Sequence, residues 1–476
     1  MQRLDVDVAV IGAGTAGLNA RREAERAGKE TLLIERGEHG TTCARVGCMP
    51  SKLLIAAADA AHGVHHAATF GVRAQGVTID GRAVLERVRE HRDRFVRGVV
   101  SSVEGIDEDK RLRGEARFVD ANTLIVETDG GDIEVRAKAT VIATGSSPWI
   151  PPPFEGLDVD VNDDVFEWED LPESVAVIGT GIIGLELGQA LHRLGVDVAF
   201  FNPFDEVGAF TDPKLDAALR EILAGELTLH LAVQGLEATR DEAGYELSWD
   251  EDGTRTSRRF ARVLASAGRR PNLGRLDLEK TGLSLDDKGR PSWDPRTCQC
   301  GDAPIFMAGD ATGHRPVLHE ASDEGSIAGE NAARYPKVGA HVRRTPLSIA
   351  FTDPQIAMVG QPFEELPGSA AVGEVSFVDQ GRAKVIARNR GLVRVYGERD
   401  GCVLLGAEML GPDVEHLSHL VAFMVQQRLT VQQALQLPIY HPVLEEGLKT
   451  ALRELARALE VDTTCRNEDL ADCPGA

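Results

Sequence analysis

The chain has 476 residues, of which 42% are hydrophobic and 27% charged, and its formal net charge is −23 at pH 7. This length and ordinary composition predict a globular enzyme of about three domains. The acidic excess argues against general affinity for nucleic acid or for an anionic membrane. We also expect no signal peptide and no membrane span, because no cationic region precedes an apolar core and no apolar run is long enough. A cytoplasmic protein with small-molecule partners is therefore expected.

The N-terminus carries the pattern of a dinucleotide-binding fold. A β-branched strand is predicted at residues 6–11, a helix to about residue 28, and a second strand at 31–34 that ends at Glu35. The turn after the first strand contains Gly12, Gly14 and Gly17 in G-x-G-x-x-G spacing. These glycines permit a tight turn and a close approach of the backbone to a pyrophosphate at a helix N-terminus. Glu35 can accept a hydrogen bond from a ribose hydroxyl, so this unit is predicted to bind a dinucleotide.

Two cysteines, Cys43 and Cys48, precede a Pro-Ser-Lys sequence at 50–52 that opens an apolar, Ala-rich run. Proline suits the first turn of a helix. Cys48 should therefore lie at the positive end of that helix, where the thiolate is favoured over the thiol. Cys43 lies close enough to form a local disulfide, and the pair is interpreted as a reversible dithiol. Two alternatives stay open here: buried apolar side chains, or half of a zinc site, which would usually need a second pair of ligands.

The next segments extend the first sheet and then leave it. Strands are predicted at residues 117–126 and 133–141, and the second ends at Ala143-Thr144-Gly145. A proline-rich linker at 148–153 follows. We interpret this linker as the exit from the first domain.

A second dinucleotide unit follows the linker. A strand at 174–178 leads to Gly179, Gly181 and Gly184, and a helix and a strand at 196–201 come next. Two such units in one chain predict two nucleotides, typically a flavin and a nicotinamide. The acid position holds Asn202, which can bond a ribose hydroxyl but is less diagnostic than a carboxylate. Residues 203–206 offer two acids and no cation for a 2′-phosphate, so NADH is favoured over NADPH.

The last third of the chain changes character. A strand at 304–308 ends in Gly309-Asp310, and from about residue 345 strands at 391–396 and 402–409 are followed by helices from Val414 onward. This part is interpreted as an interface-like domain. Near its end His441 precedes an amphipathic helix at 447–459, with Glu446 five residues on. A histidine beside a carboxylate in this position is a candidate oriented base.

Together and in this order, these motifs resemble the pyridine nucleotide-disulfide oxidoreductases, and most closely the dihydrolipoyl dehydrogenases. The resemblance covers nearly the whole chain. Besides the motifs above it includes Gly268-Arg269-x-Pro271-Asn272, Ala308-Gly309-Asp310, Phe351-Thr352-Asp353-Pro354 and His441-Pro442-x-x-x-Glu446.

The resemblance implies an α/β fold with two Rossmann-like dinucleotide-binding domains and an α+β C-terminal dimerisation domain. Residues 1–150 and 272–340 would form a discontinuous FAD-binding domain, residues 151–271 the NAD-binding domain, and residues 345–476 the interface domain of a homodimer. The implied cofactors are FAD and NAD, and no metal is implied.

The resemblance also assigns site residues. Cys48 would face the flavin, Cys43 would exchange with substrate, and Lys52 would pair with Glu186 beside the flavin ring. His441, oriented by Glu446, would act as acid and base from the other subunit. The implied cofactor positions are Gly12, Gly14, Gly17, Glu35, Thr42, Lys52, Gly114, Ala143, Thr144, Gly145 and Asp310 for FAD, and Gly179, Gly181, Gly184, Glu186, Asn202 and Gly268 toward NAD.

The implied activity passes electrons reversibly from dihydrolipoamide, or a lipoyl-bearing protein, through the Cys43–Cys48 disulfide and FAD to NAD. One alternative is an NAD(P)H-dependent reductase of another disulfide or of mercuric ion. Another is a docking subunit of a lipoyl-protein complex with secondary redox activity. The segment 406–420 also resembles soluble transhydrogenases, but these lack the cysteine pair.

Some residues depart from the family pattern. Arg45 stands where the family often has Asn, and it could bond an acidic substrate, depress a thiol pKa or be an exposed loop residue. Val443 and Glu445 replace the smaller polar residues usual in the histidine motif. In the tail, Cys465 and Cys473 are interpreted as incidental rather than as a second relay pair.

Two more cysteines are close together upstream of the tail. Cys298 and Cys300 alternate along an extended stretch and should point to opposite sides, which disfavours pairing.

Overall fold

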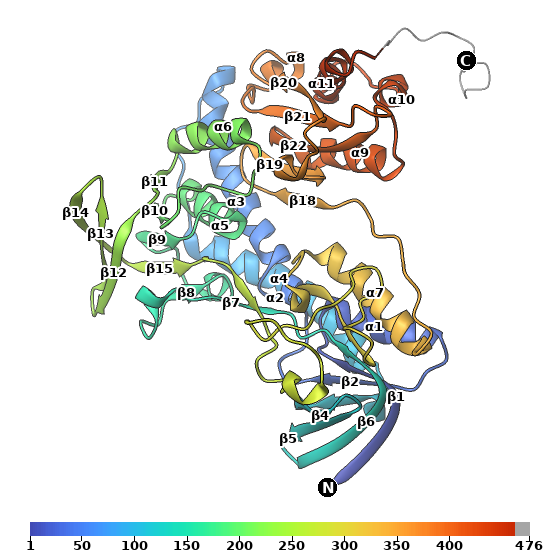
Figure 1. Ribbon diagram of the computed structural model, residues 1–476. Coiled ribbons are helices and arrows are strands. Elements are labelled where there is room, and N and C mark those ends of the chain that lie inside the picture. The colour runs from blue at the N-terminus through green and yellow to red at the C-terminus, as the bar shows by residue number, and fades with distance from the viewer. Residues whose placement is uncertain (462–476) are drawn as a thin grey trace.

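The structure is a computed structural model that describes residues 1–461. Within these residues the strands form five sheets, with helices packed against them (Figure 1). No helix in this part of the chain is both long and apolar enough to cross a membrane. The predicted tail cysteines, Cys465 and Cys473, lie outside the described residues.

The first sheet is seven-stranded and mixes parallel and antiparallel pairing. Its parallel part has the order β3-β2-β1-β6-β17, and β5 and β4 add an antiparallel meander to the other half of the long strand β6. The parallel part thus includes β17, which lies far along the chain from the other strands of this sheet. The strands are β1 (Gln2–Ile11), β2 (Thr31–Glu35), β3 (Arg111–Arg113), β4 (Glu115–Asp120), β5 (Thr123–Thr128), β6 (Gly131–Ile142) and β17 (Ile305–Met307).

One strand prediction in this sheet is wrong. The segment 117–126 is not a single strand but the hairpin β4–β5, which turns at residues 121–122. The turn is built by polar side chains: the Asp120 carboxylate accepts from the Asn122 N–H at 2.8 Å, and the Asn122 amide donates to the Ala137 carbonyl at 2.9 Å. Local hydrogen bonds of Asp and Asn are a common cause of such turns.

Helices cover one side of the first sheet, and further helices lead away from it. α1 (Thr15–Arg26) and α7 (Leu318–Arg334) pack side by side (Figure 1), closely enough that a Cβ on Gly325 would lie 2.2 Å from the Ala16 carbonyl oxygen. The short helix α2 (Thr42–Arg45) is followed by α3 (Cys48–His66) and α4 (Gly81–Glu104). α3 packs against both α4 and α5, so it joins the first sheet to the second.

The second sheet is parallel, with order β11-β10-β9-β15-β8. The predicted strand at 174–178 is confirmed as β9, and the glycine turn after it leads into α5. A three-stranded antiparallel sheet, β12-β13-β14, projects from this part of the chain and was not predicted (Figure 1). The bounds are β8 (Asp160–Val161), β9 (Ser174–Ile178), α5 (Ile182–Arg193), β10 (Asp197–Phe201), α6 (Pro213–Ala224), β11 (Thr228–His230), β12 (Gln234–Asp241), β13 (Gly244–Glu251), β14 (Thr254–Phe260) and β15 (Arg262–Ala265).

The two connections between these sheets lie next to each other. β7 (Ser146–Pro148), just ahead of the proline-rich segment, pairs antiparallel with β16 (Arg269–Pro271). The chain therefore leaves the first sheet and returns to it through one two-stranded ribbon.

The C-terminal part is an antiparallel sheet of order β18-β19-β22-β21-β20 covered by helices. Its core is a separate apolar cluster that includes Val393, Val395, Met409 and Leu452, all nearly inaccessible to solvent. The predicted α/β fold with two Rossmann-type sheets and an α+β C-terminal part is confirmed. The bounds are β18 (Leu347–Ala350), β19 (Gln355–Gly360), β20 (Ala371–Ser376), α8 (Gly381–Val385), β21 (Leu392–Gly397), β22 (Leu404–Gly411), α9 (Val414–Gln426), α10 (Val431–Gln436) and α11 (Glu445–Ala458).

Candidate active site

The two predicted redox cysteines lie together at the start of α3. Cys48 is the first residue of this 19-residue helix, as predicted, and Cys43 lies in α2, just before it. Both are free thiols in the structure. A hydrogen bond from the Cys43 thiol lowers the pKa of Cys48 to about 7, against the effect of burial and with help from the Lys52 ammonium. The same hydrogen bond raises the pKa of Cys43. Cys48 is therefore the thiolate of the pair, and thiolate is the reactive form.

The zinc alternative requires further ligands near this pair. Within residues 1–461 no group of three or more His, Cys, Asp or Glu side chains is placed to hold a metal ion. Structural zinc sites use four such ligands. The geometry therefore favours the dithiol interpretation.

An ion pair lies beside the cysteines. Lys52, one turn into α3 from Cys48, places its Nζ 2.7 Å from a Glu186 carboxylate oxygen on α5. The other Glu186 oxygen accepts from the Phe351 N–H at 2.8 Å, and the Lys52 ammonium lies 4.5 Å from the centre of the Phe351 ring. Glu186 is 6% exposed. Such a buried carboxylate needs both a cation and a hydrogen-bond donor, and it has both.

Two neighbouring cavities run along the predicted flavin site. The first has a volume of about 430 Å³ and is lined by Gly12, Glu35, Gly114 and Thr144, among others. The second has a volume of about 300 Å³ and contains both cysteines, Lys52, Glu186 and Asp310 in its wall. Because both cavities are lined by Gly14, Thr42, Ala143 and Gly145, they are adjacent and together form one elongated space.

The residues around this space fit a dinucleotide such as FAD. A Cβ on Gly14 would meet no atom within 4 Å, so the backbone there is open to a ligand. The Thr144 hydroxyl is buried without a hydrogen-bond partner. The Glu35 carboxylate is oriented by the Ala13 N–H at 2.8 Å and the Gly37 N–H at 2.7 Å. This leaves its remaining lone pairs for a ribose hydroxyl.

The other two glycines of this motif pack tightly against the neighbouring backbone. A Cβ on Gly12 would lie 2.2 Å from the Ala143 carbonyl oxygen, and one on Gly17 would lie 1.8 Å from the Gly12 carbonyl oxygen. Gly12 also has φ +110°. These two positions hold the strands and α1 in close contact, and they position Gly14 at the cavity.

The second glycine motif has the same arrangement. A Cβ on Gly181, the residue before α5, would meet nothing within 4 Å, whereas one on Gly184 would lie 2.4 Å from the Gly179 carbonyl oxygen. Gly268, at φ +113°, also faces open space. The backbone around α5 thus leaves room for a second nucleotide at a helix N-terminus.

The Asn202 side chain makes hydrogen bonds around its own loop. Its amide nitrogen donates to the Thr180 hydroxyl at 2.6 Å and to the Glu206 carbonyl at 3.0 Å, and the residue is 8% exposed. In this structure the Asn202 side chain therefore fastens the loop after β10. Nearby, Asp205 pairs with Arg220 of α6.

The predicted base lies elsewhere in the subunit. Nδ1 of His441 is 2.9 Å from one Glu446 carboxylate oxygen and 3.1 Å from the other, and this hydrogen bond lowers the pKa of Glu446. The His441 side chain is 80% exposed. Neither residue lines either flavin-site cavity. One subunit therefore forms the oriented His–Glu pair but does not bring it to the cysteines.

Arg45 does not contact the thiols. Its guanidinium bonds the Glu38 carboxylate at 2.8 Å, and it lines the larger cavity beside Glu35 rather than the cavity that holds the cysteines. Lys52, not Arg45, is the cation that lowers the pKa of Cys48. The structure therefore favours a role for Arg45 in holding the loop before α2.

Cys298 and Cys300 are both buried free thiols. Cys298 packs with one apolar cluster of the first sheet and Cys300 with another. The prediction that they point to opposite sides is confirmed.

Several residues of the site were not predicted. Ser146 donates to the Asp310 carboxylate at 2.7 Å, and Arg269 donates to the Ser146 hydroxyl at 2.9 Å and to Asn162 at 3.1 Å. Phe351 holds Glu186 and Lys52 as described above. Ser146, Asn162 and Phe351 carry no charge, and their spacing in the chain gives no indication of these contacts. Arg269 and Phe351 do stand in motifs of the family, which was the available signal.

Comparison with known proteins agrees with this architecture. Residues 6–325 match the pyridine nucleotide-disulphide oxidoreductase family, and residues 347–452 match its dimerisation domain. A dihydrolipoyl dehydrogenase of Haloferax volcanii is 32% identical over 461 residues, which is 94% of this chain and 95% of that protein. One of Thermus scotoductus is 31% identical over 468 residues, covering 94% and 97%.

Solved structures share the fold. LpdA from Mycobacterium tuberculosis superposes with a TM-score of 0.81 at 24% identity, covering 96% of this chain and 100% of that one. The HOCl-induced flavoprotein disulfide reductase RclA from Escherichia coli superposes with a TM-score of 0.77 at 19% identity, covering 94% and 99%. Proteins of the matched family use FAD and NAD(H). With two glycine-turn nucleotide folds, a cysteine pair between them and a dimerisation domain, the chain belongs to the pyridine nucleotide-disulphide oxidoreductases and is an FAD-dependent, NAD-linked disulfide oxidoreductase.

Proposed function

We propose that the protein is a dihydrolipoyl dehydrogenase that oxidises dihydrolipoamide, free or carried on a lipoyl protein. The observation that carries the proposal is the pair Cys43 and Cys48 at a cavity wall, with the Cys48 thiol at a pKa of about 7. A thiol with this pKa is half ionised at neutral pH and is a good leaving group in disulfide exchange. The dihydrolipoyl dehydrogenases that match over nearly the whole chain support this substrate.

The chemistry at the cysteines is two thiol–disulfide exchanges. A substrate thiolate attacks Cys43 Sγ of the Cys43–Cys48 disulfide, which forms a mixed disulfide and releases the Cys48 thiolate. The second substrate thiolate then attacks the substrate sulfur of that mixed disulfide, which closes the lipoamide ring and releases Cys43. The substrate loses two electrons and the cysteines gain them. Bound FAD supplies the hydride chemistry that transfers this electron pair onward to NAD.

His441 would take the proton of the substrate thiol at its free Nε2, since Nδ1 is held by Glu446. Because His441 is exposed and does not line the cavity that holds the cysteines of its own subunit, the base would serve the cysteine pair of a second copy. The match of residues 347–452 to a dimerisation domain supports a homodimer of this kind. Lys52 and Glu186 would lie beside the flavin ring.

The cofactor positions and domain limits follow from the same proposal. FAD would lie in the elongated space and NAD at the N-terminus of α5, within an FAD domain of 1–150 and 272–340 and an NAD domain of 151–271. Residues 345–476 would form the interface domain. FAD would be held by Gly12, Gly14, Gly17, Glu35, Thr42, Lys52, Gly114, Ala143, Thr144, Gly145 and Asp310, and NAD by Gly179, Gly181, Gly184, Glu186, Asn202 and Gly268.

A substrate panel tests the proposal. Steady-state rates are measured with dihydrolipoamide plus NAD, and with oxidised glutathione, cystine and mercuric ion plus NADH or NADPH. The proposal predicts that dihydrolipoamide with NAD gives the highest kcat/KM. A higher value for another acceptor would make the protein a reductase of that compound. Absence of all these activities, with co-purification of a lipoyl protein, would indicate a docking subunit instead.

A further inference from the structure

The α5 helix carries three polar residues on one face. Glu186, Gln189 and Arg193 are spaced so that they line up along the helix, and all three are buried, at 6%, 4% and 8% exposure. Buried polar side chains on a helix face need partners. Each of the three finds its partner in the same short segment, residues 351–353, which leads from β18 into β19.

The contacts follow the segment residue by residue. The Glu186 carboxylate accepts from the Phe351 N–H at 2.8 Å. Gln189 makes two hydrogen bonds to the backbone of Asp353: its amide oxygen accepts from the Asp353 N–H at 2.8 Å, and its amide nitrogen donates to the Asp353 carbonyl at 2.9 Å. This pair of hydrogen bonds to one residue, called the clamp below, fixes the position of segment 351–353 along α5, as a neighbouring strand would.

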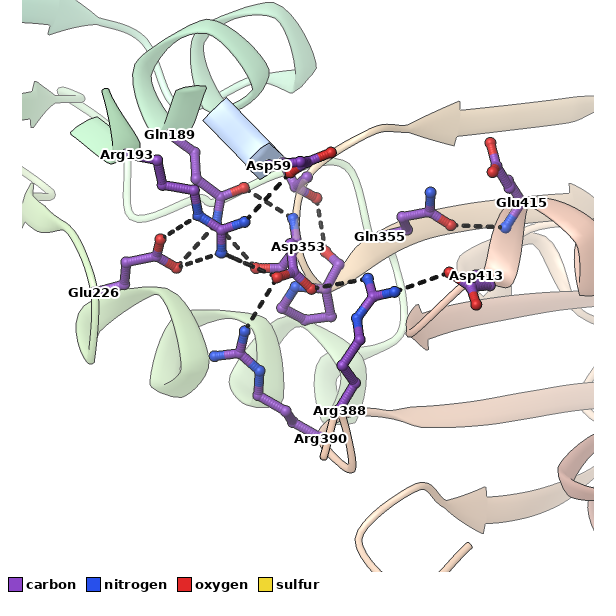
Figure 2. Close-up of polar contacts among 12 residues, drawn as sticks. Asp59, Gln189, Arg193, Glu226, Asp353, Gln355, Arg388, Arg390, Asp413 and Glu415 are labelled. Atoms are coloured by element: carbon purple, nitrogen blue, oxygen red, sulfur yellow. Dashed lines mark hydrogen bonds and ion pairs between the residues drawn. The ribbon is translucent and has the colours of Figure 1, made fainter. Parts of the chain in front are cut away.

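Charged groups surround this clamp and reinforce it. Figure 2 shows Arg193 of α5 and Arg388 and Arg390 of the C-terminal part converging on the Asp353 carboxylate from opposite sides, at 3.1, 3.3 and 3.5 Å. Arg193 also binds Glu226 with two nitrogens, at 2.6 and 3.1 Å. The segment is therefore held by α5 on one side and by the connection between α8 and β21 on the other.

We propose that Gln189 is a positioning residue for the redox centre: by clamping the backbone of Asp353 it holds Phe351 against Glu186 and Lys52, and so keeps the Lys52 ammonium beside the cysteines. The proposal rests on the proposed redox role of Cys48. Gln189 does not line either flavin-site cavity, so its role would be exerted through Asp353 and not by contact with a ligand there.

Loss of the clamp has a predictable direction. The ionisable groups that face Cys48 are Cys43 from α2, Lys52 from α3 and Glu186 from α5. Without Gln189, the Asp353 N–H loses its partner and the Asp353 carbonyl keeps a longer hydrogen bond, from Arg193 at 3.4 Å. The segment then shifts, and Phe351 no longer holds Glu186 and Lys52. The Lys52 side chain is one third exposed, and its ammonium would move toward water. Its positive charge near Cys48 would fall while the negative charge of Glu186 remained, and both changes raise the pKa of the Cys48 thiol.

The chain offers a matched control. Asn331 on α7, fully buried, clamps Gly339 in the same way: its amide nitrogen donates to the Gly339 carbonyl at 2.9 Å and its oxygen accepts from the Gly339 N–H at 2.9 Å. Gly339 belongs to the connection before β18 and has no contact with the cysteines. Asn331→Leu therefore removes an equivalent pair of hydrogen bonds without acting on Lys52.

The experiment is a titration of Cys48 in the flavin-loaded protein. All variants carry Cys43→Ser, so that one thiol titrates and the Ser hydroxyl can still donate to it, and the long-wavelength absorption of a thiolate beside flavin is followed against pH. Gln189→Leu is expected to raise the midpoint by about one unit. Asn331→Leu is expected to leave it unchanged while lowering the unfolding temperature to a similar extent.

The outcomes separate the two proposals. If Gln189→Leu lowers the unfolding temperature but leaves the midpoint where it is in the parent, Gln189 is only structural and the inference is wrong. If Gln189→Leu does not fold, Gln189→Met decides, since it keeps the length of the side chain and removes its hydrogen bonds without adding a charge beside Glu226; failure of both to yield flavin-loaded protein would also assign Gln189 to folding. If the Cys43→Ser parent shows no titration near neutral pH, the proposed redox role of Cys48 fails first.

Discussion

The Lys52 ammonium lies 2.7 Å from the Glu186 carboxylate although 134 residues separate the two in the chain. One residue belongs to the helix that Cys48 opens and the other to the helix that follows the second glycine turn. The ion pair therefore ties the redox cysteines to the second nucleotide fold. Because the same Glu186 is bonded by Phe351, the C-terminal part of the chain also contributes to this contact.

The first prediction concerns the two cysteines. Cys48→Ser should keep bound flavin but lose the long-wavelength absorption that appears on two-electron reduction, because the proposal places Cys48 beside the flavin and because burial still raises the pKa of the remaining Cys43 thiol. Absorption spectra before and after anaerobic reduction by a dithiol measure this. Cys43→Ser is the control, since it retains the Cys48 thiolate and should show the band without reduction. A band of unchanged intensity in Cys48→Ser would contradict the assignment.

The second prediction concerns the base. His441→Gln should leave folding intact, since the side chain is 80% exposed, and should lower turnover of dihydrolipoamide by roughly 10²–10⁴, the scale of a lost general base. The control is His341→Gln, which removes another histidine near a carboxylate, with Nε2 3.8 Å from Glu330. Equal turnover in the His441 and His341 variants would remove His441 from the mechanism.

The third prediction separates the glycines of each motif. Gly14→Ala should change the free energy of unfolding of the apoprotein by less than about 0.5 kcal/mol, because its Cβ meets no atom within 4 Å. The Cβ would project into the flavin space and weaken FAD binding by about tenfold. Gly181→Ala should act in the same way on NAD and leave FAD bound. Flavin fluorescence and NAD titration measure the two affinities.

Gly12→Ala is the control for that series. Its Cβ would lie 2.2 Å from the Ala143 carbonyl oxygen at φ +110°, so it should destabilise the fold by about 1–3 kcal/mol or more. If Gly14→Ala destabilised the apoprotein as much as Gly12→Ala does, the interpretation that the backbone at Gly14 is open to a ligand would be wrong.

The fourth prediction concerns acid stability. Burial of the Asp353 carboxyl favours its neutral form, but Arg193, Arg388 and Arg390 outweigh burial and hold its pKa below the ordinary 3.8. A carboxyl with a lowered pKa in the folded state stabilises the fold above its unfolded pKa and loses that contribution as the pH falls. The free energy of unfolding should therefore decrease below about pH 4, and Asp353→Asn should show a smaller decrease over the same range.

Urea unfolding at a series of pH values measures this slope. Asp379→Asn is the control: Asp379 pairs with Lys384 at 2.7 Å on the surface, where ion pairs contribute little. The interpretation of Asp353 as the charged centre of the network fails if both variants show the wild-type slope.

Local elements whose ends are marked by charged residues, glycine or proline could be predicted from the sequence. The strand 174–178 matches β9 at both ends, because charged residues precede it and a glycine turn ends it, and α9 begins at Val414 as expected. Cys48 was placed at the start of its helix by the proline that follows. The Lys52–Glu186 and His441–Glu446 pairs were also expected, the first from the family resemblance and the second from a histidine just ahead of a predicted helix with a carboxylate five residues on.

Contacts between distant segments could not be predicted in the same way. Gln189 and Asp353 are 164 residues apart, and neither residue type nor spacing marks them as partners. The hairpin β4–β5 was missed because its turn depends on Asn122 reaching a carbonyl of β6, a contact that exists only once the sheet is formed. The hydrogen bonds of the Asn202 amide to Thr180 and Glu206 likewise exist only once the loop after β10 is folded.

The separation of His441 from the cysteines of its own subunit has a genetic consequence. If the base serves the neighbouring copy, a chain that lacks only the cysteine and a chain that lacks only the histidine are each inactive as pure dimers. Co-expressed, they can assemble into mixed dimers in which one of the two centres combines an intact thiol pair with an intact imidazole. Two defective alleles would then restore activity together.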